Sequence, residues 1–376
     1  MNTVTRRAES MADMLFLALD LGGTTWKLAF GITSEPEPRV RTMPAPHLDR
    51  LLEEIAAAKR RFHLAPDAAV RSCYEAGRDG FWLHHALHAH NVDNVVVDPS
   101  SIAVDRRARR AKTDRIDATA LLRQLMNATA GDRRGWREVH VPSREAEADR
   151  QLQREWEACK ADRNRVRMRI FSLLATQGVR LRVTRRFLEH LALVRVWDGS
   201  PLPVAVLARL TREWTQYQHI EARRRELLEA RRVRIEEASD TVANQVRHLT
   251  RLRGIGPNGA LTLSTELFAW RHFTSGRQIG ACVGLTPTPY RSDQHSHEQG
   301  ISRSGNRRVR ALSVELAWKW LLWQPHSALS RWFHAHFGQH RRARRIGIVA
   351  VARKLLIALW RYLMTNEVPE GALVRA

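Results

Sequence analysis

The chain has little cysteine and no long apolar run, and both shortages exclude whole classes of protein. Its cysteines, Cys73, Cys159 and Cys282, form no Cys-x-x-Cys pair. This argues against a disulfide framework and against a structural zinc site. No apolar run approaches the roughly 20 residues that a membrane span needs. The first residues are polar and no long hydrophobic region follows them, so no secretory signal is evident. We expect a reduced, cytoplasmic protein with no membrane segment.

Acidic residues are also scarce relative to basic ones. The 376 residues include 62 Lys and Arg against 39 Asp and Glu, which gives a formal net charge of +23. Such an excess attracts nucleic acid irrespective of base sequence, because each neutralised phosphate releases counterions. With 44% apolar residues, the chain can bury sizeable cores, and its length suggests two or three domains. The composition therefore predicts a nucleic-acid-binding protein.

Strand and helix patterns alternate over the first 140 residues. The run from Leu15 to Ile32 predicts two strands joined at Gly22 and Gly23. Further strands are predicted over 69–74 and 94–97, and helices over 49–62, over 80–90 and from residue 112 onward. Such alternation predicts an α/β domain over residues 1–140.

The rest of the chain has a helical pattern. Residues 143–174 and 211–252 are highly charged and almost free of Gly and Pro, and they predict two long helices, arranged as an antiparallel coiled coil in a domain over 141–250. Residues 251–376 predict an all-α domain with glycine-rich breaks, ending in a helical stretch over 307–364.

Four carboxylates in the first domain are candidates for metal binding. Asp20 interrupts an apolar strand, and burying an unpaired acid there would be costly. Glu75 follows a short strand, and Asp114 and Asp117 lie three residues apart on one helix. Oxygen ligands of this kind suit two Mg²⁺ ions that assist phosphodiester cleavage. Each acid also has a simpler explanation when taken alone. Asp114 and Asp117 could serve only to complement the helix dipole, and Glu75 could be an ordinary loop acid.

Two glycine-containing stretches of the last domain also suggest chemistry. Arg253-Gly254-Ile255-Gly256-Pro257 resembles a helix-hairpin-helix turn, whose backbone N–H groups contact a DNA phosphate, although an ordinary helix–helix turn would look the same. Serines occur in residues 284–293 and 300–310 beside an arginine cluster. An exposed serine near cations can attack a phosphate, whereas the same serines could simply cap helices.

Taken in order, these elements resemble the DEDD-type transposases of insertion-sequence family 110, with their 1111, 116 and 902 relatives and the Piv DNA invertases. The strand that holds Asp20, the stretch Tyr74-Glu75-Ala76-Gly77 and the stretch Lys112-Thr113-Asp114-Arg115-Ile116-Asp117-Ala118 match the family's acidic elements. The stretches G-I-G-P, G-L-T-P and G-I-S-R-S-G-N-R-R-V-R match its C-terminal domain. The similarity runs from about residue 15 to 365.

This resemblance implies a RuvC-like domain of RNase H fold, a coiled coil, and a C-terminal transposase domain with a helix-hairpin-helix-like element. It implies that Asp20, Glu75, Asp114 and Asp117 bind Mg²⁺ (or Mn²⁺) and that a C-terminal serine is the nucleophile. Counting from the family's pattern selects Ser292, although Arg-Ser-Asp-Gln stands where the family has Ser-Ser-Gly-Gly, so Ser302 and Ser304 are alternatives. The residues expected to contact DNA or RNA are Lys112, Arg253, Gly254, Gly256, Arg303, Arg307, Arg308 and Arg310.

The implied activity is DNA recombination through a covalent phosphoserine–DNA intermediate. The implied partners are donor and target DNA, a structured bridge RNA, and further copies of the chain in a dimer or tetramer, in the bacterial cytoplasm at the nucleoid. Three other functions are compatible with parts of the sequence. A sugar kinase would use Leu19-Asp20-Leu21-Gly22-Gly23-Thr24-Thr25 as a phosphate loop, but no downstream G-T-G-x-G element follows. A resolvase would cut without a covalent intermediate, and a non-catalytic protein would only bind nucleic acid.

Overall fold

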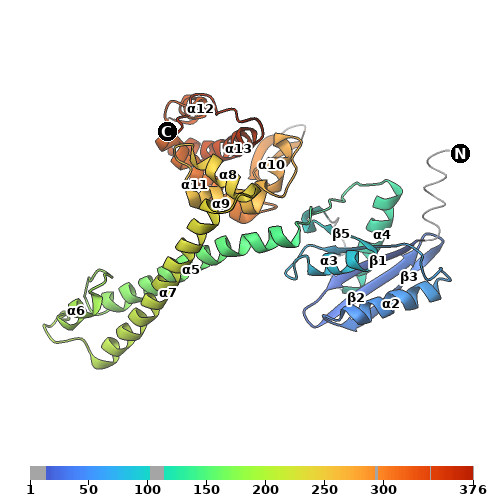
Figure 1. Cartoon of the computed structure of the whole chain (residues 1–376), viewed down its shortest axis with the longest axis horizontal. Helices are drawn as coiled ribbons and strands as arrows, with labels where there is room; N and C mark the ends of the chain where they lie inside the picture. Colours follow the sequence, from blue (N-terminus) through green and yellow to red (C-terminus); the bar gives the residue numbers. More distant parts are fainter. Residues whose placement is uncertain (1–13, 102–113, 293–294, 339, 376) are drawn as a thin grey trace. The chain divides into compact units, whose positions relative to one another are not determined.

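The computed structural model describes residues 14–101, 114–292, 295–338 and 340–375. The chain divides into two compact units, residues 1–141 and residues 142–376. The first unit contains a five-stranded sheet with helices, and the second is mainly helical (Figure 1). The expected mixture of an α/β part and a helical part is confirmed. Within the described residues, no helix is both long and apolar enough to cross a membrane.

The sheet of the first unit has the strand order β3-β2-β1-β4-β5. Strands β1, β2 and β3 are antiparallel neighbours, whereas β4 and β5 run parallel to β1. The expected hairpin and the two later strands are confirmed, but β3 was not predicted. The strands are β1 (Leu15–Leu21), β2 (Thr25–Ile32), β3 (Glu35–Pro44), β4 (Val70–Glu75) and β5 (Val92–Val97).

Helices cover both faces of this sheet. Helices α2 (Leu48–Arg61) and α3 (Trp82–Ala89) pack with Leu15, Leu17 and Leu19 of β1. Helix α4 (Asp114–Ala130) covers the opposite face, where it packs with Phe16 and Ala18. Since side chains alternate along a strand, Asp20 belongs to the face that α4 covers. A short 3₁₀ turn, η1 (Pro99–Ser101), follows β5.

The second unit begins with two long helices, α5 (Arg144–Ala175) and α7 (Val204–Glu236), joined through α6 (Phe187–Ala192). Ion pairs from Arg163 to Glu221 and from Arg169 to Glu213 cross between the long helices, and their registers show that the helices are antiparallel. The prediction of a single helix over 211–252 was wrong. The chain leaves α7 after residue 236, and a new helix begins after Asp240, whose carboxylate accepts the N–H of Ala243.

The C-terminal part packs seven helical segments around one apolar core. The prediction of helices alone was wrong here, because Pro287–Ser292 and His295–Ile301 pair as two antiparallel strands. The predicted stretch 307–364 is divided among three helices. The elements are α8 (Thr241–Thr250), α9 (Pro257–Leu263), the π-helix η2 (Ser264–Phe268), α10 (Gly276–Cys282), β6 (Pro287–Ser292), β7 (His295–Ile301), α11 (Arg307–Trp323), α12 (Ala328–Phe337) and α13 (Arg341–Thr365).

Candidate functional sites

Two of the predicted acids lie at the carboxyl ends of neighbouring strands of the first unit. Strands β1 and β4 are parallel, with Leu19 opposite Tyr74, so the next residues along each strand are Asp20 and Glu75. Glu75 shares its face of β4 with Cys73, which packs in the cluster beneath α4. The carboxyl ends of β1 and β4 therefore carry Asp20 and Glu75 side by side on one face of the sheet. Asp20 is half-buried, and Glu75 is exposed.

The other two acids belong to α4. Asp114 is the first residue of this helix, and its side chain lies outside the described residues, as does Lys112. Asp117 is exposed, and the residue after it, Ala118, is buried with Phe16 and Ala18. The beginning of α4 thus lies on the face that carries Asp20. In the described part of the chain, no three His, Cys, Asp or Glu side chains approach closely enough to hold a metal ion.

The turn between β1 and β2 has a steric reason for its glycine. A Cβ atom on Gly22 would lie 2.5 Å from the carbonyl oxygen of Thr25, a distance that no side chain tolerates. Gly22 is therefore required to close the hairpin two residues after Asp20, and the turn geometry accounts for this glycine without a bound nucleotide.

In the second unit, two of the sequence motifs interlock through glycine. A Cβ on Gly284 would lie 2.1 Å from the carbonyl oxygen of Ser304, and one on Gly305 would lie 2.1 Å from that of Cys282. Both glycines have left-handed φ angles, +66° and +75°. The backbones on either side of this contact therefore lie too close together for a Cβ atom at either glycine.

This contact brings three hydroxyl groups together. The Oγ of Ser302 lies 3.2 Å from the Oγ of Ser304 and 3.2 Å from the Oγ1 of Thr286. Ser302 is exposed, and Ser304 is half-buried. Ser292, by contrast, is the last residue of strand β6, and its side chain lies outside the described residues.

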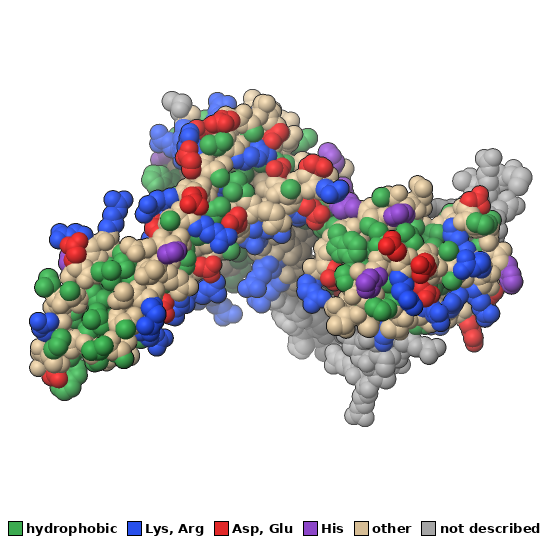
Figure 2. Space-filling model, turned by 60° about the horizontal axis from the view of Figure 1, so that its bottom comes forward, with side chains coloured by type: hydrophobic (Ala, Val, Ile, Leu, Met, Phe, Trp, Pro, Cys, Tyr) green, Lys and Arg blue, Asp and Glu red, His purple; other side chains and the backbone are tan. Residues whose placement is uncertain are grey.

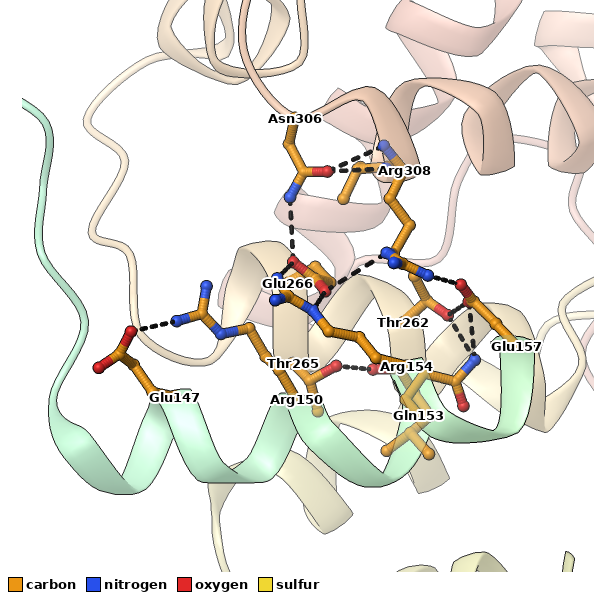
Figure 3. A network of polar contacts seen from close by, with 12 residues as sticks. Glu147, Arg150, Gln153, Arg154, Glu157, Thr262, Thr265, Glu266, Asn306 and Arg308 are labelled. Carbon is orange, nitrogen blue, oxygen red and sulfur yellow. Dashed lines mark hydrogen bonds and ion pairs between the residues drawn. The ribbon is translucent and has the colours of Figure 1, made fainter. Parts of the chain in front are cut away.

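A buried acid contacts residues 302–306, which we call the serine segment (Figure 3). Glu266, in the π-helix, is 1% exposed and accepts two hydrogen bonds from Arg154 of α5, at 2.7 and 3.0 Å. It also accepts one from the side-chain amide of Asn306, at 3.1 Å. The side-chain oxygen of Asn306 meanwhile accepts the backbone N–H groups that begin α11. Asn306 therefore joins the end of the serine segment to both α11 and the buried carboxylate.

The network continues toward the long helices. Arg308 pairs with Glu157 of α5 and lies 3.7 Å from Glu266. Gln153 donates to Glu157 at 3.1 Å and to Thr262 at 2.9 Å (Figure 3). Burial, and then the neighbouring charge of Arg154, lower the pKa of Arg308. Arg308 is thus engaged within the protein.

The remaining predicted basic contacts divide into two groups. Arg310 donates to the backbone carbonyls of Val283 and Ser304, at 2.9 and 3.0 Å, and so stabilises the serine segment. Arg303, Arg307 and Arg253 are exposed, as a nucleic-acid contact requires.

The Gly-Ile-Gly-Pro stretch forms the turn between α8 and α9, as predicted. Gly254 has a φ of +88°, and a Cβ there would lie 3.3 Å from that of Trp323. The N–H of Ile255 donates to Leu252, whereas nothing lies within 4 Å of a Cβ placed on Gly256. Gly254 therefore faces the interior, and the open side of the turn is at Gly256.

One buried cation lies beneath this turn. Arg231 of α7 is 3% exposed, donates to the side-chain oxygen of Asn258, and has its guanidinium 4.4 Å from the ring centre of Trp156. Burial lowers the pKa of Arg231 to about 10. These contacts fix the turn to the two long helices.

Known transposases are similar to the C-terminal part of this chain and to the chain as a whole. A family model described as "Transposase IS116/IS110/IS902 family" matches residues 246–331, which include the Gly-Ile-Gly-Pro turn, Glu266 and the serine segment. The protein y4rJ of Sinorhizobium fredii, named as a transposase, is 37% identical over 380 residues, covering 96% of this chain and 94% of y4rJ.

The chain belongs to the IS116/IS110/IS902 family of transposases. A second Sinorhizobium fredii protein named as a transposase, y4qE, is 31% identical over 259 residues, covering 66% of this chain and 58% of y4qE. The transposase for insertion sequence element IS1328 of Yersinia enterocolitica is 28% identical over 170 residues, covering 45% of this chain and 49% of that protein. The resemblance inferred from the motifs is confirmed, and DNA is the substrate that a transposase acts on.

Sequence reasoning missed the residues that support the serine segment of this transposase. Glu266 is a lone acid in an apolar stretch. The same pattern made Asp20 a candidate, but Glu266 was not chosen as one. Its partner Arg154 lies 112 residues earlier, among many similar arginines. Nothing local in the sequence distinguishes that arginine from its neighbours.

Proposed function

We propose that this transposase cuts and rejoins DNA strands with two groups of residues. Asp20, Glu75, Asp114 and Asp117 hold Mg²⁺ (or Mn²⁺), and a serine of the C-terminal part forms a covalent bond to DNA. The observation that carries the proposal is the register of β1 and β4, in which Asp20 and Glu75 are neighbours at the carboxyl ends of two interior strands. Carboxylate oxygens are the ligands that these cations prefer.

The serine step is a phosphoryl transfer. The Oγ of Ser292, or alternatively of Ser302 or Ser304, attacks the scissile phosphorus and loses its proton. One ester bond between phosphorus and a deoxyribose oxygen breaks, which leaves a free hydroxyl on one DNA end and a phosphoserine ester on the other. Attack of a second strand's hydroxyl on that ester then rejoins DNA and frees the serine. Bound Mg²⁺ would stabilise the charge on the attacking and leaving oxygens.

The architecture assigned to this activity has three domains. We assign residues 1–140 to a RuvC-like domain of RNase H fold, residues 141–250 to a coiled-coil domain, and residues 251–376 to the transposase domain with a helix-hairpin-helix-like turn. The sheet order β3-β2-β1-β4-β5 and the antiparallel pairing of α5 with α7 support these assignments.

The proposed partners follow from the same activity. A structured bridge RNA would read donor and target sequences by base pairing, while the protein holds phosphates through its arginines, Lys112 and the Gly256 turn. The net charge of +23 supports a partner of this kind. A dimer or tetramer would combine acids from one copy with the serine of another, at the bacterial nucleoid.

Replacing single acids tests the metal site. Asp20→Asn and Asp117→Asn should each lower Mg²⁺-dependent nicking of element-end DNA by at least about 100-fold, since each removes a charged ligand. Asp132→Asn is the matched control, because that exposed acid of the same unit bonds to Arg134 instead. Binding of the DNA, measured by gel shift, should stay unchanged in all variants. Nicking at the normal rate by Asp20→Asn or Asp117→Asn would remove the basis for the metal site.

A further inference from the structure

The end of the α5–α7 helix pair exposes an unusual amount of apolar surface. We call residues 176–212 the tip; they include α6 and the start of α7. Within it, Trp197 is 84% exposed, and Leu193 and Val204 are exposed to a similar extent. Figure 2 shows apolar side chains gathered at this end, with basic side chains around them. Exposed apolar patches of this kind mark interaction surfaces.

The exposure of Trp197 does not come from a poorly formed fold. The tip has its own core, in which Phe187 and Trp214 are buried with ring centres 5.1 Å apart. Leu191, Leu202 and Leu210 fill the rest of that core. The buried positions are already occupied, so Trp197 is an additional aromatic side chain that the structure presents to solvent.

Trp197 is also held in a defined turn. The N–H of Gly199 donates to the carbonyl of Val196 at 3.0 Å, and the N–H of Val196 donates to that of Ser200 at 2.9 Å. The carboxylate of Asp198 accepts the N–H of Ser200 at 2.9 Å. Gly199 supplies the left-handed φ of +82° that closes the turn. Presenting the indole therefore costs little further ordering of the backbone when a ligand binds.

The charge of the tip identifies the kind of partner. It contains seven arginines against two acids, all exposed. In the described chain, one of these arginines, Arg186, forms an ion pair, with Glu189. The other six form none: Arg180, Arg182, Arg185, Arg195, Arg209 and Arg212. The tip thus combines uncompensated guanidinium groups with an exposed aromatic ring that projects from an ordered turn.

We propose that the tip binds an unpaired DNA strand, with Trp197 stacking on a base and the surrounding arginines contacting phosphates. An aromatic platform within a basic surface is how proteins hold single strands irrespective of sequence. A duplex keeps its base faces covered, so the ring of Trp197 has no place to stack on it. This inference rests on the proposed function, because strand cutting and exchange produce unpaired DNA.

A second copy of the chain is the competing occupant, and the charge argues against it. A symmetric contact would put the same surface on both sides. Seven arginines would then face seven arginines with only two acids on each side, and like charges across an interface are unfavourable. DNA phosphates supply the complementary charge instead.

The test measures binding of the full-length protein to dye-labelled oligo(dT), to the same strand paired with oligo(dA), and to oligo(U), all in EDTA. Trp197→Ala should weaken oligo(dT) binding about 10-fold and leave duplex binding unchanged, since stacking on one base is lost. Trp197→Phe should keep most of the affinity. Leu193→Ala is the matched control, because it removes exposed apolar area from the same tip without removing a ring.

Several outcomes would overturn the inference. Equal losses for strand and duplex, or no loss for either, would exclude stacking on unpaired bases. Binding of oligo(U) but not oligo(dT) would make the ligand RNA. A change of oligomeric state in sedimentation, with oligo(dT) affinity intact, would make the tip a self-association surface. Because the assay contains no metal, its result is independent of whether the four acids cut DNA.

Discussion

The side-chain amide of Asn306 donates to the buried carboxylate of Glu266 across 3.1 Å. Asn306 cannot reverse its amide group, since its oxygen is held by the backbone N–H groups of Arg308 and Val309. The orientation of the serine segment at residues 302–306 is therefore set by a contact with the π-helix. Through Arg154, the same carboxylate connects that segment to helix α5.

Removing Glu266 should destabilise the second unit strongly. Glu266→Ala removes a carboxylate that is 1% exposed and leaves Asn306 and the partly exposed Arg154 without their acceptor, which should cost about 1–3 kcal/mol. Urea unfolding followed by tryptophan fluorescence reports mainly on this unit, because nine of the twelve tryptophans lie in residues 142–376. Glu315→Ala is the control: its pair with Lys319 is exposed, and its loss should cost less than about 0.5 kcal/mol. Equal effects of the two variants would contradict the role given to Glu266.

Adding one methyl group at Gly284 should disturb the serine segment. In Gly284→Ala the Cβ would meet the carbonyl oxygen of Ser304 at 2.1 Å, and the φ of +66° would be strained as well. We expect a loss of more than about 2 kcal/mol in the same unfolding experiment. Gly256→Ala, which meets nothing within 4 Å, should change stability by less than about 1 kcal/mol. A Gly284→Ala protein as stable as Gly256→Ala would show that the two motifs do not interlock as described.

Protonation of His84 should make the first unit less stable in acid. The Nδ1 of His84 lies 3.0 Å from the side-chain oxygen of Asn94. Burial, which outweighs that bond, and the nearby His88 and His85 lower the pKa of His84 below its ordinary value of 6.5; Asp93 opposes this. The folded state thus favours neutral His84. Its stabilising contribution is complete above about pH 6.5 and is lost as the pH falls toward the lowered pKa.

Thermal melts of the wild type and of His84→Gln check this sign. Between about pH 7.5 and pH 5.5, the wild type should lose more of its melting temperature than the variant, because the variant has no proton to take up at this position. A steeper loss in His84→Gln would mean that protonation of His84 stabilises the fold.

Much of the first unit could be predicted from local patterns. An apolar run with two glycines predicted the β1–β2 hairpin, and the acid within that run pointed to Asp20. Strand β3 was missed because its sequence, E-P-E-P-R-V-R-T-M-P, contains three prolines. It forms because it is an edge strand, where proline's missing N–H is tolerated.

The second unit shows where local patterns are insufficient. Strands β6 and β7 are polar and β6 contains two prolines, so neither strand has an alternating apolar pattern. The break between α7 and α8 has no glycine or proline to signal it, and Asp240 is one of many acids nearby. The contacts of Glu266 join residues more than a hundred positions apart. Such partners are set by tertiary packing, which one sequence does not reveal.

The most direct test of the account is a search for a covalent protein–DNA product. The purified protein would be incubated with its element-end DNA, the flanking RNA and Mg²⁺, and resolved on a denaturing gel beside Ser292→Ala, Ser302→Ala and Ser304→Ala. We expect a DNA adduct in the wild type that one of these serine variants lacks, and we expect that serine to be Ser292. Mg²⁺-dependent nicking that is lost in Asp20→Asn but never accompanied by an adduct would contradict it, and would indicate a resolvase-like nuclease that uses water.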